Sequence, residues 1–253
     1  MLEFKLDPSD ILNRLPHDVR VSIEGSIAAV IYESFVLPAD EDYVTARLLA
    51  ANGLSRAFYW SAAQAIEKYL KGYLLLHSQS VIPLGRGNSH ALAELLERAA
   101  DLDDDFSTLG LSPKADLSKY AGIIGSAKTN TLHEFVQVIE KNGHPSNRYN
   151  ASGVEYFSLY VHALDTAVAL IRGKLTSNSI DENISEIGDD LKRAFYLQNE
   201  AFTHALYPSP LESFSKLGSI WSMKSTRLDV LKKNPSFTGF THALNWLKQR
   251  MKT

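Results

Sequence analysis

The chain has 253 residues, of which 45% are hydrophobic and 22% are charged. This balance is typical of a globular protein with a hydrophobic core and excludes disorder of the whole chain. A formal net charge of -3 argues against tight, sequence-independent binding of duplex nucleic acid, which needs many lysines and arginines on one surface. It leaves room for a local basic patch.

The chain contains no cysteine, which excludes disulfides, thiolate metal sites and a thiol nucleophile. Residues Met1–Asp7 include acidic side chains and lack a basic start followed by an apolar region, so no secretory signal is predicted. The longest apolar stretch, Val154–Ile171, is interrupted by Glu155, His162 and Asp165. It therefore lacks the uninterrupted run of about 18 apolar residues that a membrane span needs. We expect a soluble, cytoplasmic protein with no membrane partner.

Helical periodicity dominates the sequence, and no run of β-branched residues alternates with polar ones between turn signals. The segment Val21–Val36 mixes Ile, Val and Gly and is compatible with a helix or a short strand. A helix is predicted over Asp40–Asn52, because its acidic first residues suit a helix N-terminus and Gly53 suits a C-terminal stop. A longer helix is predicted over Ser55–Gln79, with the serine as its N-cap.

The helix predicted over Ser55–Gln79 is strongly amphipathic. Its apolar residues recur at spacings of three and four, which is typical of a buried helix face. Four polar residues share one line at i, i+3, i+4 and i+7: Gln64, Glu67, Lys68 and Lys71. Glu67 precedes Lys71 by four residues, the order that favours an ion pair. This polar stripe is either a solvated helix face or a binding surface, and its spacing favours neither.

Four signals built on serine or threonine predict the starts of further helices. They are Ser89, Ser112 followed by Pro113, Thr131 with Glu134, and Ser152 with Glu155. The last of these helices is expected to end near Gly173. The composition then becomes polar, and later apolar stripes around Phe195, Trp221 and Trp246 predict a C-terminal helical unit. The predicted divisions are an N-terminal extension (1–39), a helical bundle (40–173) and a C-terminal helical region (174–253).

Short motifs follow a specific order through residues 40–173. A helix containing Tyr43 is followed, after a break at Gly53, by Phe58-Tyr-Trp-Ser-Ala-Ala-Gln-Ala-Ile-Glu-Lys-Tyr-Leu-Lys, and after a loop by Ser89-His-Ala-Leu-Ala-Glu-Leu-Leu. An Arg148-Tyr149 pair precedes the last helix. This order resembles the HEPN domain, and the stripe with Lys71 is its strongest mark. The resemblance implies an all-α fold: a HEPN-like bundle of four or five helices, here with an additional C-terminal helical unit.

The resemblance also carries functional expectations. HEPN domains are often dimeric and occur beside nucleotidyltransferases, in toxin–antitoxin systems and in RNA-directed defence. It therefore implies a homodimer, a nucleotide, RNA or protein ligand, a nucleotidyltransferase partner and no cofactor. It places a turn and the polar stripe around one cleft, so the binding residues it implies are Arg148, Tyr149, Asn150, Gln64, Lys68 and Lys71.

The catalytic motif of the family is broken in this chain. HEPN ribonucleases carry an arginine, four to six intervening residues and then a histidine near the start of the final helix. Arg148 lies in the expected place, but Gly153, Val154 and Glu155 occupy the positions for the histidine. We therefore expect no catalytic residue and a non-catalytic binding module. The alternative is a diverged metal-independent ribonuclease in which Arg148 acts with Glu155 or His162.

Two other histidine patterns bear on metal binding and proton transfer. His133-Glu134 lacks a second histidine four residues on, so no zinc site is predicted. His162 and Asp165 lie three apart on the predicted polar side of the last bundle helix. They are compatible with a proton-transfer pair, but a surface hydrogen bond is the simpler interpretation, because no second histidine or serine is spaced to complete a site.

Overall fold

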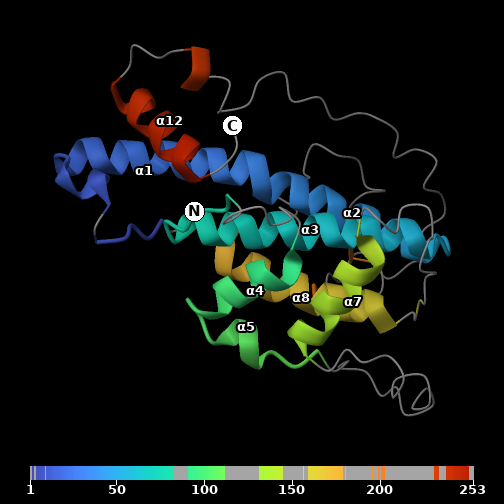
Figure 1. Cartoon of the computed structure of the whole chain (residues 1–253). Coiled ribbons are helices and arrows are strands. Elements are labelled where there is room, and N and C mark those ends of the chain that lie inside the picture. Colours follow the sequence, from blue (N-terminus) through green and yellow to red (C-terminus); the bar gives the residue numbers. More distant parts are fainter. Residues whose placement is uncertain are drawn as a thin grey trace.

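The protein is a bundle of helices (Figure 1). The computed structural model describes residues 2, 4–8, 10–82, 91–111, 131–144, 156, 159–178, 180, 195–196, 199, 201–202, 231–233 and 238–250. Within these ranges there is no β-strand, so the predicted all-α class is confirmed. The helices are η1 (Ile11–Arg14), α1 (His17–Ile31), η2 (Tyr32–Val36), α2 (Leu37–Ala51), α3 (Ser55–Leu76), α4 (Leu92–Ala100), α5 (Asp105–Thr108), α7 (Leu132–Gly143), α8 (Leu159–Leu175) and α12 (Thr238–Arg250).

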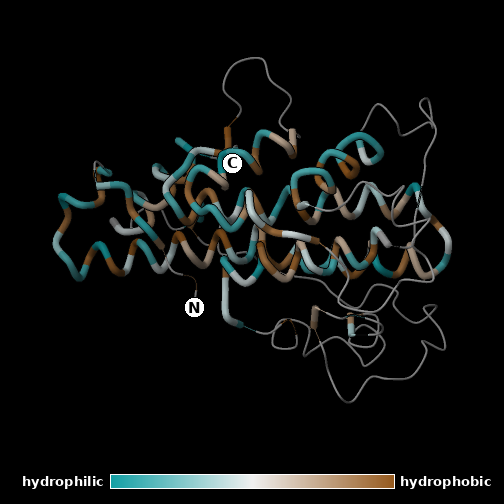
Figure 2. The backbone as a smooth tube through the Cα atoms, turned by 90° about the horizontal axis from the view of Figure 1, so that it is seen from below, coloured by the Kyte–Doolittle hydropathy of each residue, from teal (hydrophilic) through white to brown (hydrophobic). Residues whose placement is uncertain are grey.

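Helix α3 lies at the centre of the bundle, where α1, α2, η2, α4, α7 and α8 all contact it. The helix predicted over Ser55–Gln79 is confirmed, although it ends at Leu76. The predicted cap is wrong, because the N-cap position is Leu54 and no side chain caps this end. Most of α3 is buried, and its large aromatic side chains pack into the core. Figure 2 shows hydrophobic and hydrophilic residues alternating along the described helices, as expected when each helix turns one face inward.

The first long helix begins much earlier than predicted. One helical segment runs over His17–Ala51, so the predicted start at Asp40 is wrong and the undecided segment Val21–Val36 is helical. The segment contains one π-helical turn, η2, directly before the first turn of α2, where Pro38 lies. Proline lacks an amide hydrogen and its ring collides with the carbonyl four residues back, so a wider turn accommodates it without ending the helix.

The His17–Ala51 helix is long and apolar enough to cross a membrane by length and composition alone. Core helices of soluble proteins meet the same test. In this helix the α2 half packs on α3, and two of its charged residues, Asp40 and Arg47, form buried ion pairs with α8. That half is therefore an internal element of the bundle.

Helices α4 and α7 show two ways of capping a helix. The predicted capping box is confirmed at α7, where Thr131 and Glu134 exchange side-chain to backbone hydrogen bonds. At α4 the cap comes from another helix: the Glu140 carboxylate accepts hydrogen bonds from the backbone amides of Leu92 at 3.1 Å and Ala93 at 3.4 Å. The other predicted signals, at Ser89, Ser112 and Ser152, lie outside the described residues.

Helix α8 buries the side that was predicted to be polar and exposed. Asp165 is only 1% exposed, so its predicted surface position is wrong. Its Oδ1 atom accepts a hydrogen bond from the Tyr43 hydroxyl at 2.6 Å and lies 2.8 Å from Arg47 Nε. Arg47 also donates to the Phe195 carbonyl at 2.6 Å. A carboxylate is stable at this depth because α2 supplies the opposite charge and a second donor.

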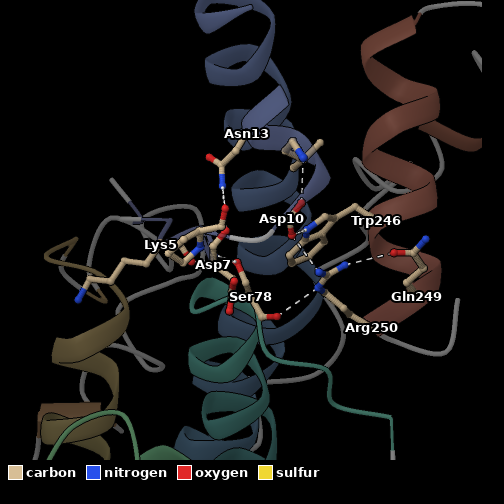
Figure 3. A network of polar contacts seen from close by, with 10 residues as sticks. Lys5, Asp7, Asp10, Asn13, Ser78, Trp246, Gln249 and Arg250 are labelled. Carbon is tan, nitrogen blue, oxygen red and sulfur yellow. Dashed lines mark hydrogen bonds and ion pairs between the residues drawn. The ribbon is translucent and has the colours of Figure 1, made fainter. Parts of the chain in front are cut away.

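Residues from both ends of the chain meet near the end of α3 (Figure 3). The Ser78 hydroxyl donates to the Lys5 carbonyl at 2.9 Å. The Asp10 carboxylate accepts from Trp246 and from Arg250, each at 2.9 Å, and Arg250 also donates to the Ser78 carbonyl. Described residues before 40 and after 173 belong to the same hydrophobic cluster as those of the bundle. The predicted domain boundaries themselves stay predictions.

Candidate ligand-binding groove

The polar stripe on α3 lies between neighbouring helices. The predicted pair is confirmed, with 2.5 Å between Lys71 Nζ and Glu67 Oε1, but Glu67 is only 6% exposed. Lys68 pairs with Asp42 of α2. Burial raises the pKa of the Asp42 carboxyl, and the lysine opposes that shift. Gln64 is half-buried. Because α3 has a helix on almost every side, its stripe is a set of partly enclosed contacts.

A groove opens where the first turn of α3 faces the end of α7. Its volume is about 570 Å³, within the range of small-molecule pockets. We call it the α3–α7 groove, and its lining residues are Gly53, Leu54, Ser55, Arg56, Ala57, Trp60, Asn142, Gly143 and His144.

The α3 side of the groove attracts anions. In an α-helix the first backbone amides have no intrahelical acceptor, and they give this end a partial positive charge. No side chain caps α3, whose regular pattern begins with the Phe58 amide donating to the Leu54 carbonyl at 2.9 Å. Arg56, in the same turn, adds a full positive charge that the helix dipole disfavours. A bound anion would offset both charges, and phosphates commonly bind at such helix ends.

The groove also presents apolar side chains to solvent. Trp60 is 36% exposed and Leu54 is 53% exposed, while most large apolar residues of α3 are buried. An accessible indole is a platform on which a nucleobase can stack. Arg56, Trp60 and Gln64 are spaced by four, so they extend the polar stripe toward the start of the helix. Sequence reasoning missed Arg56 and Trp60, because it started the polar stripe at Gln64.

A small second cavity adjoins the groove. It has a volume of about 10 Å³, room for roughly one water molecule, and is lined by Ala63, Gln64, Glu67, Leu92, Glu140, Gly143 and His144. Gly143 and His144 line both spaces. A Cβ atom on Gly143 would lie 2.6 Å from the Tyr59 carbonyl oxygen, so only glycine lets α7 approach α3 this closely. That approach places His144 beside α3, between the groove and the second cavity.

Most of the other predicted site residues cannot be placed in the groove. Arg148, Tyr149, Asn150 and Glu155 lie outside the described residues. His162 lies on α8, one turn before the buried Asp165. Burial raises the pKa of the Asp165 carboxyl, which Arg47 opposes. In the parts of the chain that the structure describes, no group of three or more His, Asp or Glu side chains is placed to hold a metal ion.

No protein-family model matches this chain, and neither a curated protein nor a solved structure matches it. The likeness to HEPN domains therefore rests on the sequence motifs, and the helical bundle is compatible with it.

Proposed function

We propose that this chain is a non-catalytic HEPN-type module that binds a nucleotide, or a phosphate-bearing end of an RNA, in the α3–α7 groove. The observation that carries the proposal is the composition of this groove. It combines an uncapped helix N-terminus, an arginine in the same turn and an exposed indole one turn further on.

Each part of a nucleotide has a matching group in the α3–α7 groove. The phosphate lies at the first amides of α3 and beside Arg56, because both favour negative charge. The base stacks on Trp60. His144 lines the groove and Gln64 lines the adjoining second cavity, and both supply polar atoms that contact base edges. The overall charge of -3 fits this reading, because one nucleotide needs a local cation and no extended basic surface.

Equilibrium titration tests the proposal. Wild-type protein is titrated with AMP, ATP and a short 5′-phosphorylated single-stranded RNA, followed by tryptophan fluorescence and by calorimetry. Arg56→Ala is expected to weaken binding about 10- to 100-fold, since a hydrogen bond to a charged group contributes about 1.5–3 kcal/mol. Trp60→Phe is expected to remove most of the fluorescence change.

The matched control is Arg20→Ala, because Arg20 lies on α1 and pairs with Glu24 away from the groove. Its affinity should equal that of the wild type. Equal affinity in Arg56→Ala, or no binding of any of the three ligands, contradicts the proposal.

Two further experiments test the alternatives. Metal-independent RNA cleavage that is lost in Arg148→Ala would replace the binding module by a diverged ribonuclease, and Glu155→Gln and His162→Ala would then identify its second residue. Co-purification with a nucleotidyltransferase, without nucleotide binding, would favour a protein partner. A place in a toxin–antitoxin or defence system, like the homodimer, rests on the resemblance.

A further inference from the structure

The small second cavity beside the α3–α7 groove is lined by groups that accept hydrogen bonds. Gln64 and Glu67 line it from α3, and Glu140 lines it from α7. The described residues that line it include no lysine or arginine. Two carboxylates without a cation in the same lining favour a hydrogen-bond donor or a positive charge in this space. The cavity is therefore the electrostatic opposite of the α3 end of the groove, where Arg56 favours an anion.

Two of these side chains retain hydrogen-bonding capacity. The Glu140 carboxylate accepts one backbone amide at each oxygen, from Leu92 at 3.1 Å and from Ala93 at 3.4 Å. A carboxylate has about four lone-pair sites, so it can accept further hydrogen bonds. The Gln64 side chain is half-buried, and no described residue forms a hydrogen bond with its amide group. A ligand group that enters the cavity can therefore be bound from both helices.

The size of the cavity limits what can enter it. Its volume of about 10 Å³ has room for roughly one water molecule, and the exocyclic amino group of a nucleobase has a similar size. An amino group brings two hydrogens to the acceptors. A carbonyl oxygen at the same place brings none, and Glu67 and Glu140, when ionised, can only accept hydrogen bonds. The cavity therefore favours an amino group over a carbonyl oxygen.

The cavity lies within reach of a base that stacks on Trp60. Trp60 and Gln64 are spaced by four on α3, so they share one face and lie about 6 Å apart along the helix axis. A nucleobase spans this distance, and His144 lines both the groove and the cavity. Arg56 lies one turn before Trp60. One face of α3 thus presents, in order, a phosphate-binding end, a stacking surface and a set of acceptors.

We infer that the second cavity receives the exocyclic amino group of the bound base, so that the groove selects adenine, guanine or cytosine over hypoxanthine and uracil. The amino group replaces one water molecule and donates hydrogen bonds to Glu140 and Gln64. The inference rests on the proposed nucleotide binding, and it names the part of the base that the protein recognises.

Nucleotides that differ in one exocyclic group test the selection. The pairs are AMP with IMP, GMP with IMP, and CMP with UMP, each titrated into the full chain by calorimetry. In at least one pair the amino-bearing nucleotide should bind about 10- to 100-fold more tightly, because its counterpart loses a hydrogen bond to a charged acceptor. Equal affinity within every pair, or tighter binding of IMP and UMP, overturns the inference. If these nucleotides still bind and Arg56→Ala weakens them, the proposed function stands without it, whereas no binding at all contradicts both.

Two substitutions connect the selection to the cavity. Gln64→Met keeps the length of the side chain and removes its amide, and Glu140→Gln keeps the shape and removes the charge. Each should lower the preference for the amino-bearing nucleotide about 2- to 10-fold. Glu140 also caps α4, so circular dichroism and the melting temperature check that variant, and Gln64→Met decides the test if it unfolds.

The matched control is Gln137→Met, because this glutamine is exposed on α7 and lines neither the groove nor the cavity. It should leave the preference unchanged. An unchanged preference in Gln64→Met overturns the placement of the amino group in the cavity.

Discussion

Helices α1 and α3 are similar in sequence character and opposite in environment. Both are rich in apolar residues, but α3 has neighbours on almost every side and buries most of its length, including a glutamate. Helix α1 buries a single row of residues and contacts mainly α12 and η2. The difference shows that apolar content does not decide burial by itself. The number of helices that reach a given face decides it, and among the described residues fewer helices reach α1 than reach α3.

The largest expected difference between the two environments concerns buried and exposed charge. Arg172 of α8 donates to both carboxylate oxygens of Asp40, at 2.9 and 3.2 Å, and both residues are buried. Arg172→Met leaves that carboxylate without its cation, so it should lower the free energy of unfolding by about 3–5 kcal/mol. On α1, Arg20→Met removes a partly exposed pair and should change it by less than about 1 kcal/mol. Urea denaturation of both variants checks this, and equal losses would show that the Arg20–Glu24 pair on α1 is enclosed as fully as the Asp40–Arg172 pair.

Alkaline pH should destabilise the folded chain through tyrosines that are buried in the bundle. Burial is the main reason why the pKa values of Tyr43 and Tyr69 lie well above 10. It also raises the pKa of Tyr73 to about 12. Above pH 10 the unfolded chain releases these protons while the folded chain keeps them. The free energy of unfolding should therefore fall as pH rises, by about 1.4 kcal/mol per pH unit for each such phenol. Residues His17–Ile31 of α1 contain no tyrosine and add nothing to this slope.

Urea denaturation between about pH 9 and 11.5 measures the slope of unfolding free energy against pH. Tyr69→Phe should make it shallower, because one ionising phenol is lost. A free energy that stays constant across this range would show that these phenols ionise equally in the folded and unfolded chains.

Two glycines should respond with opposite signs. Gly143→Ala places a Cβ atom 2.6 Å from the Tyr59 carbonyl oxygen and 2.9 Å from the Ala63 side chain, so α7 has to move away from α3. We expect a loss of about 1–3 kcal/mol in thermal or chemical unfolding. Gly25→Ala meets nothing within 4 Å and should stabilise the monomeric fold by about 0.5–1 kcal/mol through helix propensity. A stabilising Gly143→Ala is the result that would contradict the close approach of α7.

The smallest expected effects on stability concern the N-terminal ends of α7 and α3. Thr131→Ala removes a capping hydrogen bond from α7 and should cost about 1 kcal/mol. Ser55→Ala should be nearly neutral, because the serine is the first helical residue of α3 and not its cap. Melting temperatures of the two variants give the comparison, with the wild type as reference. A larger loss of melting temperature in Ser55→Ala than in Thr131→Ala would show that the serine caps α3.

The parts of the fold that depend on nearby residues were predictable. The extent of α3, the capping box at Thr131 and Glu134 and the ion pair between Glu67 and Lys71 all follow from spacings of three or four. The start of the first long helix was not, because the acidic residues from Asp40 suit a helix N-terminus, whereas a π-helical turn carries the helix through Pro38. None of the predicted binding residues lines the groove; Gln64 lines only the adjoining cavity, and Arg56, Trp60 and His144 were recognised only once α7 was placed against α3.

The sequence by itself therefore determined the helical class, the central amphipathic helix and most helix periods, since these depend on propensity and on contacts within a few turns. Tertiary structure alone decided which faces are covered. Asp165 is buried because α2 supplies Arg47 and Tyr43 from more than a hundred residues away, and Trp60 lines a groove because the end of α7 lies beside the start of α3. Such pairings join distant segments, and no local pattern encodes them.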